Sequence, residues 1–115
     1  MCDQARLNKI LTAVALYAQN VFKEQLDSVV LYGSYARGDY DAESDIDLMI
    51  LVDMDREALM SYRRQFSALT SQLSLEDEDC VTISLLLESS RHLQRFCRTV
   101  PFYQNVMREG VRVSA

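Results

Sequence analysis

Two acidic side chains separated by one residue are the most chemically suggestive feature of the sequence. Asp45 and Asp47 introduce the apolar run 46–52, which predicts a β-strand. Alternate residues of a strand point to the same face, so both carboxylates are predicted to project together. Like charges placed this way repel each other, and a divalent cation between them makes the arrangement favourable. The pair is therefore predicted to bind a metal ion, with solvated charges at a strand end as the alternative.

A glycine–serine turn lies ten residues before this pair. Gly33 and Ser34 directly follow the β-branched apolar run 28–32, which predicts a strand that ends at the glycine. Backbone N–H groups at such a turn form an anion site that suits phosphate, and glycine lets the chain approach without a Cβ clash. Arg37 follows with a planar guanidinium that fits phosphate oxygens. The segment therefore predicts a phosphate-binding turn that leads into metal ligands.

Two common phosphate-binding motifs are excluded at this turn. Gly33 and Gly38 have the glycine spacing of a Walker A loop, but Asp39 and Tyr40 stand where that loop has Lys and Ser or Thr. A carboxylate at that place would repel phosphate. The chain also contains no G-x-G-x-x-G sequence, which excludes the dinucleotide-binding fingerprint.

The overall composition is that of one globular domain, predicted to span residues 1–115. Apolar residues make up 49% and charged residues 25%, and the formal net charge of −5 argues against direct nucleic-acid binding. No apolar run approaches the roughly 20 residues that cross a bilayer, and the first residues lack a signal-peptide pattern. We therefore expect a cytoplasmic protein without a membrane segment. Three cysteines, without metal-ligand spacing, argue against a disulfide framework or a zinc site.

Hydrophobic periodicity predicts the elements that must position these residues. Helical spacing is found over residues 4–23, and again from Leu59 to Leu73. The three predicted strands are 28–32, 46–52 and 80–87, and two further helices are predicted over 89–97 and 101–110. This order predicts an α+β (α/β two-layer) fold: a small mixed β-sheet with helices packed on one face. Within 46–52 the apolar face that meets the helices is Ile46, Leu48, Ile50 and Val52.

The stretches LYGSYARG (31–38) and SDIDL (44–48) resemble the signature of the DNA polymerase β-like nucleotidyltransferase superfamily. They are most similar to its minimal, stand-alone nucleotidyltransferases, including antitoxin-like members. The resemblance covers residues 27–53 well, and the segment 101–110 resembles a closing segment of this group. It implies a polymerase-β-like nucleotidyltransferase palm.

The resemblance also implies a mechanism that these residues support. Asp45 and Asp47 would be the catalytic carboxylates and would hold Mg²⁺, with two ions roughly 3.5–4 Å apart. Gly33, Ser34 and Arg37 would bind the triphosphate of ATP or another nucleoside triphosphate. The family usually supplies a third carboxylate from the next strand, where this chain has Thr82 at the matching place.

The third metal ligand is left open by the alternation of that strand. Cys80, Thr82 and Ser84 are predicted to face the metal side, and none of them is acidic. Asp79 is the nearest carboxylate. It alternates with Cys80 and Thr82, so its side chain is predicted to point to the helix side unless a β-bulge turns it. Asp79 is therefore a third candidate ligand that depends on the local backbone.

The function implied is transfer of a nucleotidyl group, AMP by analogy, from a nucleoside triphosphate to a hydroxyl. A chain of this length leaves no room for an acceptor-binding domain, so the acceptor is expected on a partner. The family resemblance suggests a tyrosine of a small helical HEPN-type toxin, with the chain in the antitoxin role. The alternative is a catalytically weak or inactive module that neutralises its partner by contact. A small-molecule nucleotidyltransferase is a weaker reading that needs a homo-oligomer to complete an acceptor pocket.

Overall fold

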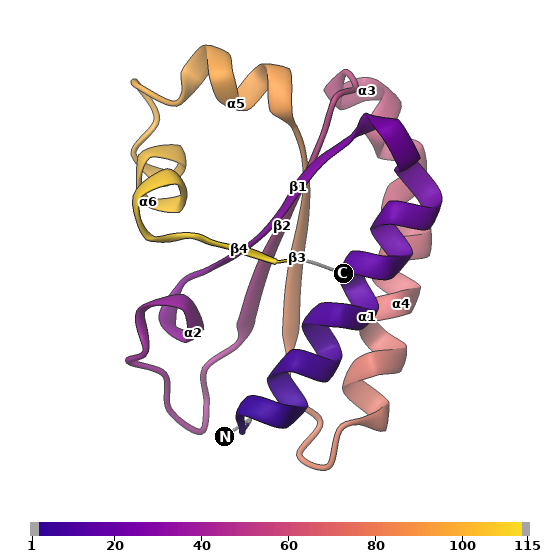
Figure 1. Cartoon of the computed structure of the whole chain (residues 1–115), viewed down its shortest axis with the longest axis vertical. Helices are drawn as coiled ribbons and strands as arrows, with labels where there is room; N and C mark the ends of the chain where they lie inside the picture. Colours follow the sequence, from indigo (N-terminus) through magenta and orange to yellow (C-terminus); the bar gives the residue numbers. More distant parts are fainter. Residues whose placement is uncertain (1–2, 114–115) are drawn as a thin grey trace.

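The computed structural model describes residues 3–113, which form a four-stranded sheet between two layers of helices (Figure 1). In chain order the elements are α1 Gln4–Phe22, η1 Lys23–Gln25, β1 Leu26–Tyr32, α2 Ser34–Arg37, β2 Ile46–Val52, α3 Arg56–Leu59, η2 Met60–Tyr62, α4 Arg63–Glu76, β3 Ile83–Ser89, α5 Ser90–Phe96, α6 Pro101–Glu109 and β4 Val111–Val113. The predicted α+β class with a mixed sheet is confirmed. No helix among the described residues is long and apolar enough to cross a membrane.

The strand order is β3-β2-β1-β4, so β2 and β1 are the two central strands. β1 pairs antiparallel with both β2 and β4, whereas β2 and β3 run parallel. A parallel pair needs a long crossover, and the helices between β2 and β3 supply it. The β1–β2 connection carries the candidate phosphate-binding turn, so the turn and the start of β2 lie at one end of the sheet.

The larger apolar core lies between the sheet and helices α1 and α4, which Figure 1 shows side by side on one face. Asp3 caps α1 by accepting a hydrogen bond from the Arg6 backbone N–H, and α1 then buries a continuous stripe. From α4, Phe66 stacks on Phe22 and meets Tyr17 edge-on, with ring centroids 5.5 and 5.1 Å apart. The β2 residues predicted for this face, Ile46, Leu48, Ile50 and Val52, are all fully buried.

The opposite face of the sheet is also covered, which corrects the expectation of helices on one face. Met49 and Leu51 of β2 form a second apolar cluster with residues of α5 and α6. Helices α5 and α6 follow β3 in the chain. Figure 1 shows that both lie on the side of the sheet opposite α1 and α4. The second cluster contains the buried residues Met49, Leu51, Leu93, Tyr103 and Val106.

Two strand assignments differ from the sequence-based prediction. β3 begins at Ile83 rather than at residue 80, because the Asp77 carboxylate accepts a hydrogen bond from Val81 N–H and keeps this stretch in a loop. Cys80 has a φ of 50° in that loop, which no strand residue adopts. β4 was not predicted, since three residues after Gly110 carry too little periodicity to identify a strand.

Phe66→Ala is expected to lower the free energy of unfolding by about 3–5 kcal/mol, because the side chain is 1% exposed and fills the space between α4 and α1. Leu75→Ala is the control, since Leu75 is 78% exposed and should change stability by no more than about 0.5 kcal/mol. Urea denaturation of both variants measures the difference. Equal effects would contradict the packing described for α4.

Candidate active site

The candidate site is organised around Asp47, the second residue of β2. In the sheet register Asp47 lies opposite Tyr32 of β1 and beside Ser84 of β3. Its side chain is half-buried and shares the sheet face of Met49 and Leu51, as the alternation predicts. Asp45 lies just before the strand and is exposed. β2 therefore presents Asp47 at the edge of the second apolar cluster, where the sheet meets solvent.

The glycine of the turn lies directly against the Asp47 carboxylate. A Cβ added to Gly33 would overlap Asp47 Oδ2 and lie 3.2 Å from Asp47 Cγ. Gly33 also has a φ of 74° and a ψ of −155°, a backbone conformation that side chains with a Cβ rarely adopt. Both the contact and the conformation therefore require glycine at this position. The turn and the carboxylate are brought together at a single place.

The short helix α2 continues from the turn and carries Ser34 and Arg37. It is closed by Gly38, which adopts a left-handed φ of 86° and donates its N–H to Ser34 O. The Arg37 guanidinium binds two carboxylates: Nε lies 3.1 Å from Asp39 Oδ2, and Nη1 lies 3.2 Å from Glu109 Oε2. These contacts raise the pKa of Arg37, so its charge is permanent at any physiological pH.

The loop between α2 and Asp45 is held by an aromatic pair and by its own polar contacts. Tyr35 is buried and stacks on Tyr40, with ring centroids 4.3 Å apart. Asp41 accepts hydrogen bonds from Glu43 N–H and Ser44 Oγ. The loop therefore has a defined path, and Asp45 enters β2 from a fixed direction.

The electrostatics of the site disfavour charge on Asp47. Burial raises the pKa of Asp47, the neighbouring Asp45 charge raises it further, and Arg37 lowers it only in part. Burial and the Asp47 charge together raise the pKa of Tyr32. Within residues 3–113 no Lys, Arg or His forms an ion pair with Asp45 or Asp47. No basic side chain of the described residues therefore relieves their repulsion through an ion pair.

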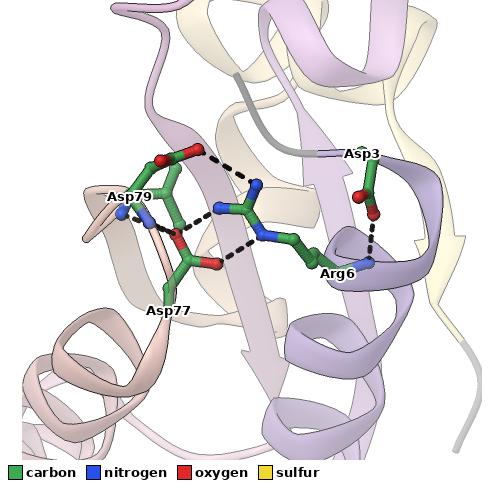
Figure 2. A network of polar contacts seen from close by, with 5 residues as sticks. Asp3, Arg6, Asp77 and Asp79 are labelled. Atoms are coloured by element: carbon green, nitrogen blue, oxygen red, sulfur yellow. Dashed lines mark hydrogen bonds and ion pairs between the residues drawn. The ribbon is translucent and has the colours of Figure 1, made fainter.

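Asp79, the third predicted ligand, lines the same hollow as Asp45 but is bound elsewhere. The hollow has a volume of about 150 Å³ and is lined by residues that include Asp45, Thr82 and Asp79. Figure 2 shows that the Arg6 guanidinium lies between Asp77 and Asp79, and its Nη1 is 3.1 Å from Asp79 Oδ2. No group of three acidic, histidine or cysteine side chains that could hold a metal is found in the described part of the chain.

The network around Arg6 fixes the loop before β3. Arg6 Nε and Nη2 lie 2.9 and 2.6 Å from the two oxygens of Asp77, a bidentate pair that joins α1 to the end of α4. Burial alone would raise the pKa of Asp77, but the bonds from Arg6, Val81 N–H and Asp79 N–H lower it overall. This network explains why Asp79 is turned toward α1 rather than toward Asp47.

The residues present nevertheless fit a divalent cation that arrives with its substrate. Mg²⁺ is usually bound in proteins by one or two carboxylates together with substrate phosphates and water. Asp45 and Asp47 supply two such ligands, and their mutual repulsion favours a cation between them. Thr82, in the loop just before β3, lines the hollow beside Asp45, and Ser84 of β3 lies beside Asp47; both side chains are neutral.

Sequence reasoning missed Glu109, the partner of Arg37. The two residues are 72 positions apart, and no local spacing in the sequence points to their contact. Only the placement of α6 beside β1 brings them together. The sequence likewise predicts only a strand at Tyr32, whereas the register places it opposite Asp47.

Comparison with known proteins identifies a family and relatives of this chain. The family model described as a nucleotidyltransferase domain matches residues 17–100. MJ0604 of Methanocaldococcus jannaschii, named as a candidate protein adenylyltransferase, is 33% identical over 89 residues, which cover 77% of this chain and 79% of that protein. MJ0141 of the same organism, named in the same way, is 66% identical over 32 residues. That match spans 28% of this chain and about a third (32%) of the relative.

The solved structures to which the chain is similar include two toxin–antitoxin crystal structures. A toxin–antitoxin solved with AMP-PNP is 20% identical, with a TM-score of 0.48 over 89% of this chain and 71% of that chain. A mutant of the toxin–antitoxin MntA–HpeT is 18% identical, with a TM-score of 0.46 over 87% and 69% of the two chains. Likeness at this level does not identify ligands or partners of the present chain.

Gly33→Ala is expected to destabilise the fold by at least about 2 kcal/mol, because the new methyl group strains the backbone and overlaps Asp47. Gly38→Ala is the matched control. Gly38 also has a positive φ, but a Cβ there would meet nothing within 4 Å, so the cost should be about 1 kcal/mol from the backbone alone. Denaturant unfolding of the two variants separates the backbone cost, which both share, from the overlap with Asp47, which only Gly33→Ala creates. Equal losses would contradict close packing of the turn on Asp47.

Asp47→Asn is expected to stabilise the metal-free protein at neutral pH. Because the native pKa of Asp47 is raised, the native state binds the proton more tightly than the unfolded chain. The wild type therefore loses stability relative to the variant as pH rises from the unfolded value of about 3.9 through the native pKa. Below both pKa values the two proteins should be equally sensitive to urea.

Urea unfolding in a metal chelator, from about pH 3 to pH 8, measures this difference across the carboxyl range. Asp27→Asn, at an exposed position of β1, is the control for loss of one negative charge. A wild type that is the more stable protein at pH 7 would show that Asp47 is stabilised, not destabilised, by its surroundings.

Proposed function

This chain belongs to the nucleotidyltransferase domain family, and from this premise we propose that it transfers an adenylyl group from ATP to a hydroxyl group on a protein. The family establishes a nucleotidyltransferase-type enzyme. The adenylyl group and the protein acceptor are supported by the names of the two relatives. One structural observation carries the proposal: the Gly33 backbone lies against the Asp47 carboxylate. A triphosphate at the turn would therefore lie next to the carboxylate pair.

The proposed reaction is an in-line displacement at the α-phosphorus. The acceptor oxygen forms a bond to that phosphorus, the bond from the α-phosphorus to the bridging oxygen of the β-phosphate breaks, and pyrophosphate leaves with the electron pair. The acceptor proton is released to water or to a carboxylate of the site. Positioning and charge neutralisation supply most of the catalysis in reactions of this kind. Both are functions that the described side chains can perform.

Each residue of the site has a role in this proposal. Asp45 and Asp47 would hold Mg²⁺, two ions as in related two-metal sites, and the metal would neutralise the triphosphate and favour the ionised acceptor. Gly33 and Ser34 offer a turn to the phosphates, and Arg37 offers a fixed positive charge. Asp79 is held by Arg6 in an ion pair that would have to break before Asp79 could serve as a ligand. We therefore assign the essential ligands to Asp45 and Asp47.

The acceptor is proposed to belong to a partner protein. Asp45 is exposed, and the hollow beside it is lined mostly by polar side chains, so a hydroxyl on another molecule can approach. The sequence resemblance suggests a tyrosine of a HEPN-type toxin, with this chain as its antitoxin. The same resemblance gives the partner as a small helical protein.

A second candidate function is a module that neutralises its partner by contact alone. It is favoured by the neutral side chains of Thr82, just before β3, and Ser84, in β3, and by the pairing of Asp79 with Arg6. These observations leave the site with two carboxylates, which would slow catalysis without preventing folding. The two candidates differ in whether Asp47 is needed for inhibition of the partner.

Asp45→Asn and Asp47→Asn are each expected to reduce adenylyl transfer by roughly a hundredfold, the scale on which loss of one electrostatic contact lowers a catalytic rate. The protein is incubated with Mg²⁺, a HEPN-type partner and ATP labelled at either the α- or the γ-phosphate. Label from the α-phosphate should appear on the partner, and label from the γ-phosphate should not. Asp27→Asn should transfer at the wild-type rate.

Transfer that persists undiminished in Asp47→Asn, or transfer of the γ-label, would overturn the proposed reaction. Inhibition of the partner by Asp47→Asn, without transfer of either label, would instead support neutralisation by contact.

A further inference from the structure

Arg37 is held in place by two carboxylates while part of its guanidinium stays available. Nε donates to Asp39 and Nη1 donates to Glu109, which uses two of the five N–H groups of arginine. Nη2 forms no hydrogen bond with any residue of the described chain, and the side chain is 43% exposed. An arginine in this state can bind a phosphate oxygen through Nη2 without releasing either carboxylate.

The two carboxylates that bind Arg37 have different mechanical roles. Asp39 is two residues away on the same loop, so it moves together with the arginine. Glu109 is the last residue of α6 and reaches Arg37 from a different element. Only the bond to Glu109 therefore fixes the direction of the guanidinium relative to the sheet and to Asp47.

Helix α6 is itself anchored, so that Glu109 has a defined position. Tyr103 and Val106 are buried in the second apolar cluster, and the Tyr103 hydroxyl donates a hydrogen bond to the buried Glu88. Burial, followed by the Glu88 carboxylate, raises the pKa of Tyr103 to about 12, so its hydroxyl stays protonated and bound. After Glu109 the chain turns at Gly110, where a Cβ would overlap Val30 of β1.

The direction of Arg37 matters because its charge already acts on Asp47. Arg37 partly lowers the pKa of Asp47, although no ion pair joins them. The Arg37 backbone N–H donates to Gly33 O, and Gly33 lies directly against the Asp47 carboxylate, so a guanidinium released from Glu109 can turn toward Asp47 and its neighbour Asp45. Pairing with either one would place a protein cation where the metal is proposed to bind.

We propose that Glu109 is a positioning residue that holds Arg37 away from Asp45 and Asp47 and presents Arg37 Nη2 to the triphosphate. This inference rests on the proposed function and adds one residue to its site. It explains why a carboxylate from the end of α6 lies beside a group that would bind nucleotide. It also predicts that loss of Glu109 weakens binding of a bare cation, whereas loss of Arg37 does not.

Glu109→Ala is expected to weaken binding of Mn²⁺ alone about tenfold, because Arg37 then competes for the carboxylates. Arg37→Ala should not weaken it, since the competing cation is gone. In the double variant Glu109→Ala/Arg37→Ala, Mn²⁺ affinity should return to the wild-type value. Electron paramagnetic resonance of free Mn²⁺ measures this affinity. A merely structural role of Glu109 would not be rescued by removal of Arg37.

Binding of MgATP gives a second readout in the same proteins. Glu109→Ala and Arg37→Ala should each weaken it about tenfold by calorimetry, and the double variant should be no weaker than Arg37→Ala alone. Glu109→Gln, which keeps an oxygen acceptor for Arg37, should fall between the wild type and Glu109→Ala. Glu24→Ala, an exposed carboxylate at the other end of the sheet, is the control and should bind like the wild type.

Different outcomes test this inference and the proposed function on which it rests. A wild type that binds neither Mn²⁺ nor MgATP would overturn the proposed function and the inference together. A wild type that binds both, with losses in Glu109→Ala that persist unchanged when Arg37 is absent, would overturn only the inference. Thermal unfolding of the wild type and of Glu109→Gln checks that both proteins are folded under the conditions of the Mn²⁺ and MgATP titrations.

Discussion

The contact between a backbone turn and one carboxylate sets the geometry of the candidate site. β1 ends at Tyr32, opposite Asp47, and the chain must turn at once over the Asp47 side chain. A Cβ at this position would overlap the Asp47 side chain, and the positive φ of the turn is a conformation that glycine adopts readily. Only glycine therefore fits there. The position of α2, and with it of Ser34 and Arg37, follows from this turn. The glycine–serine turn and the Asp47 carboxylate are therefore one packing unit.

The distribution of ion pairs leaves the negative charge of the site unneutralised. Four arginines pair with carboxylates in the described structure, and none of those carboxylates is Asp45 or Asp47. Asp47 is instead half-buried beside a like charge, which costs stability in the folded protein without a cation. Such local cost is typical of sites that bind ligands. The pairs are Arg6 with Asp77 and Asp79, Arg37 with Asp39 and Glu109, Arg56 with Glu88, and Arg91 with Asp53 and Asp55.

The second layer of helices connects this site to the rest of the fold. The sheet face that carries Asp47 at one end is covered by α5 and α6 further along. The candidate site and the second apolar cluster therefore lie on the same face of the sheet. Tyr32 illustrates the boundary, because its ring meets Phe102 of α6 edge-on while its register partner is Asp47. A change in the packing of α6 would therefore reach the site through Tyr32 and through Glu109.

Local sequence signals were sufficient for the class of fold, the turn at Gly33, the strand that carries Asp47, and the apolar face of β2 that packs on α1 and α4. Strand alternation and a glycine turn are short-range patterns, and they retain their meaning whatever surrounds them. The tertiary structure alone decided the coverage of both sheet faces, the start of β3 at Ile83, the capture of Asp79 by Arg6, and the pairing of Arg37 with Glu109. Each of these depends on contacts between residues far apart in the chain, whose energies no local pattern of residue types encodes.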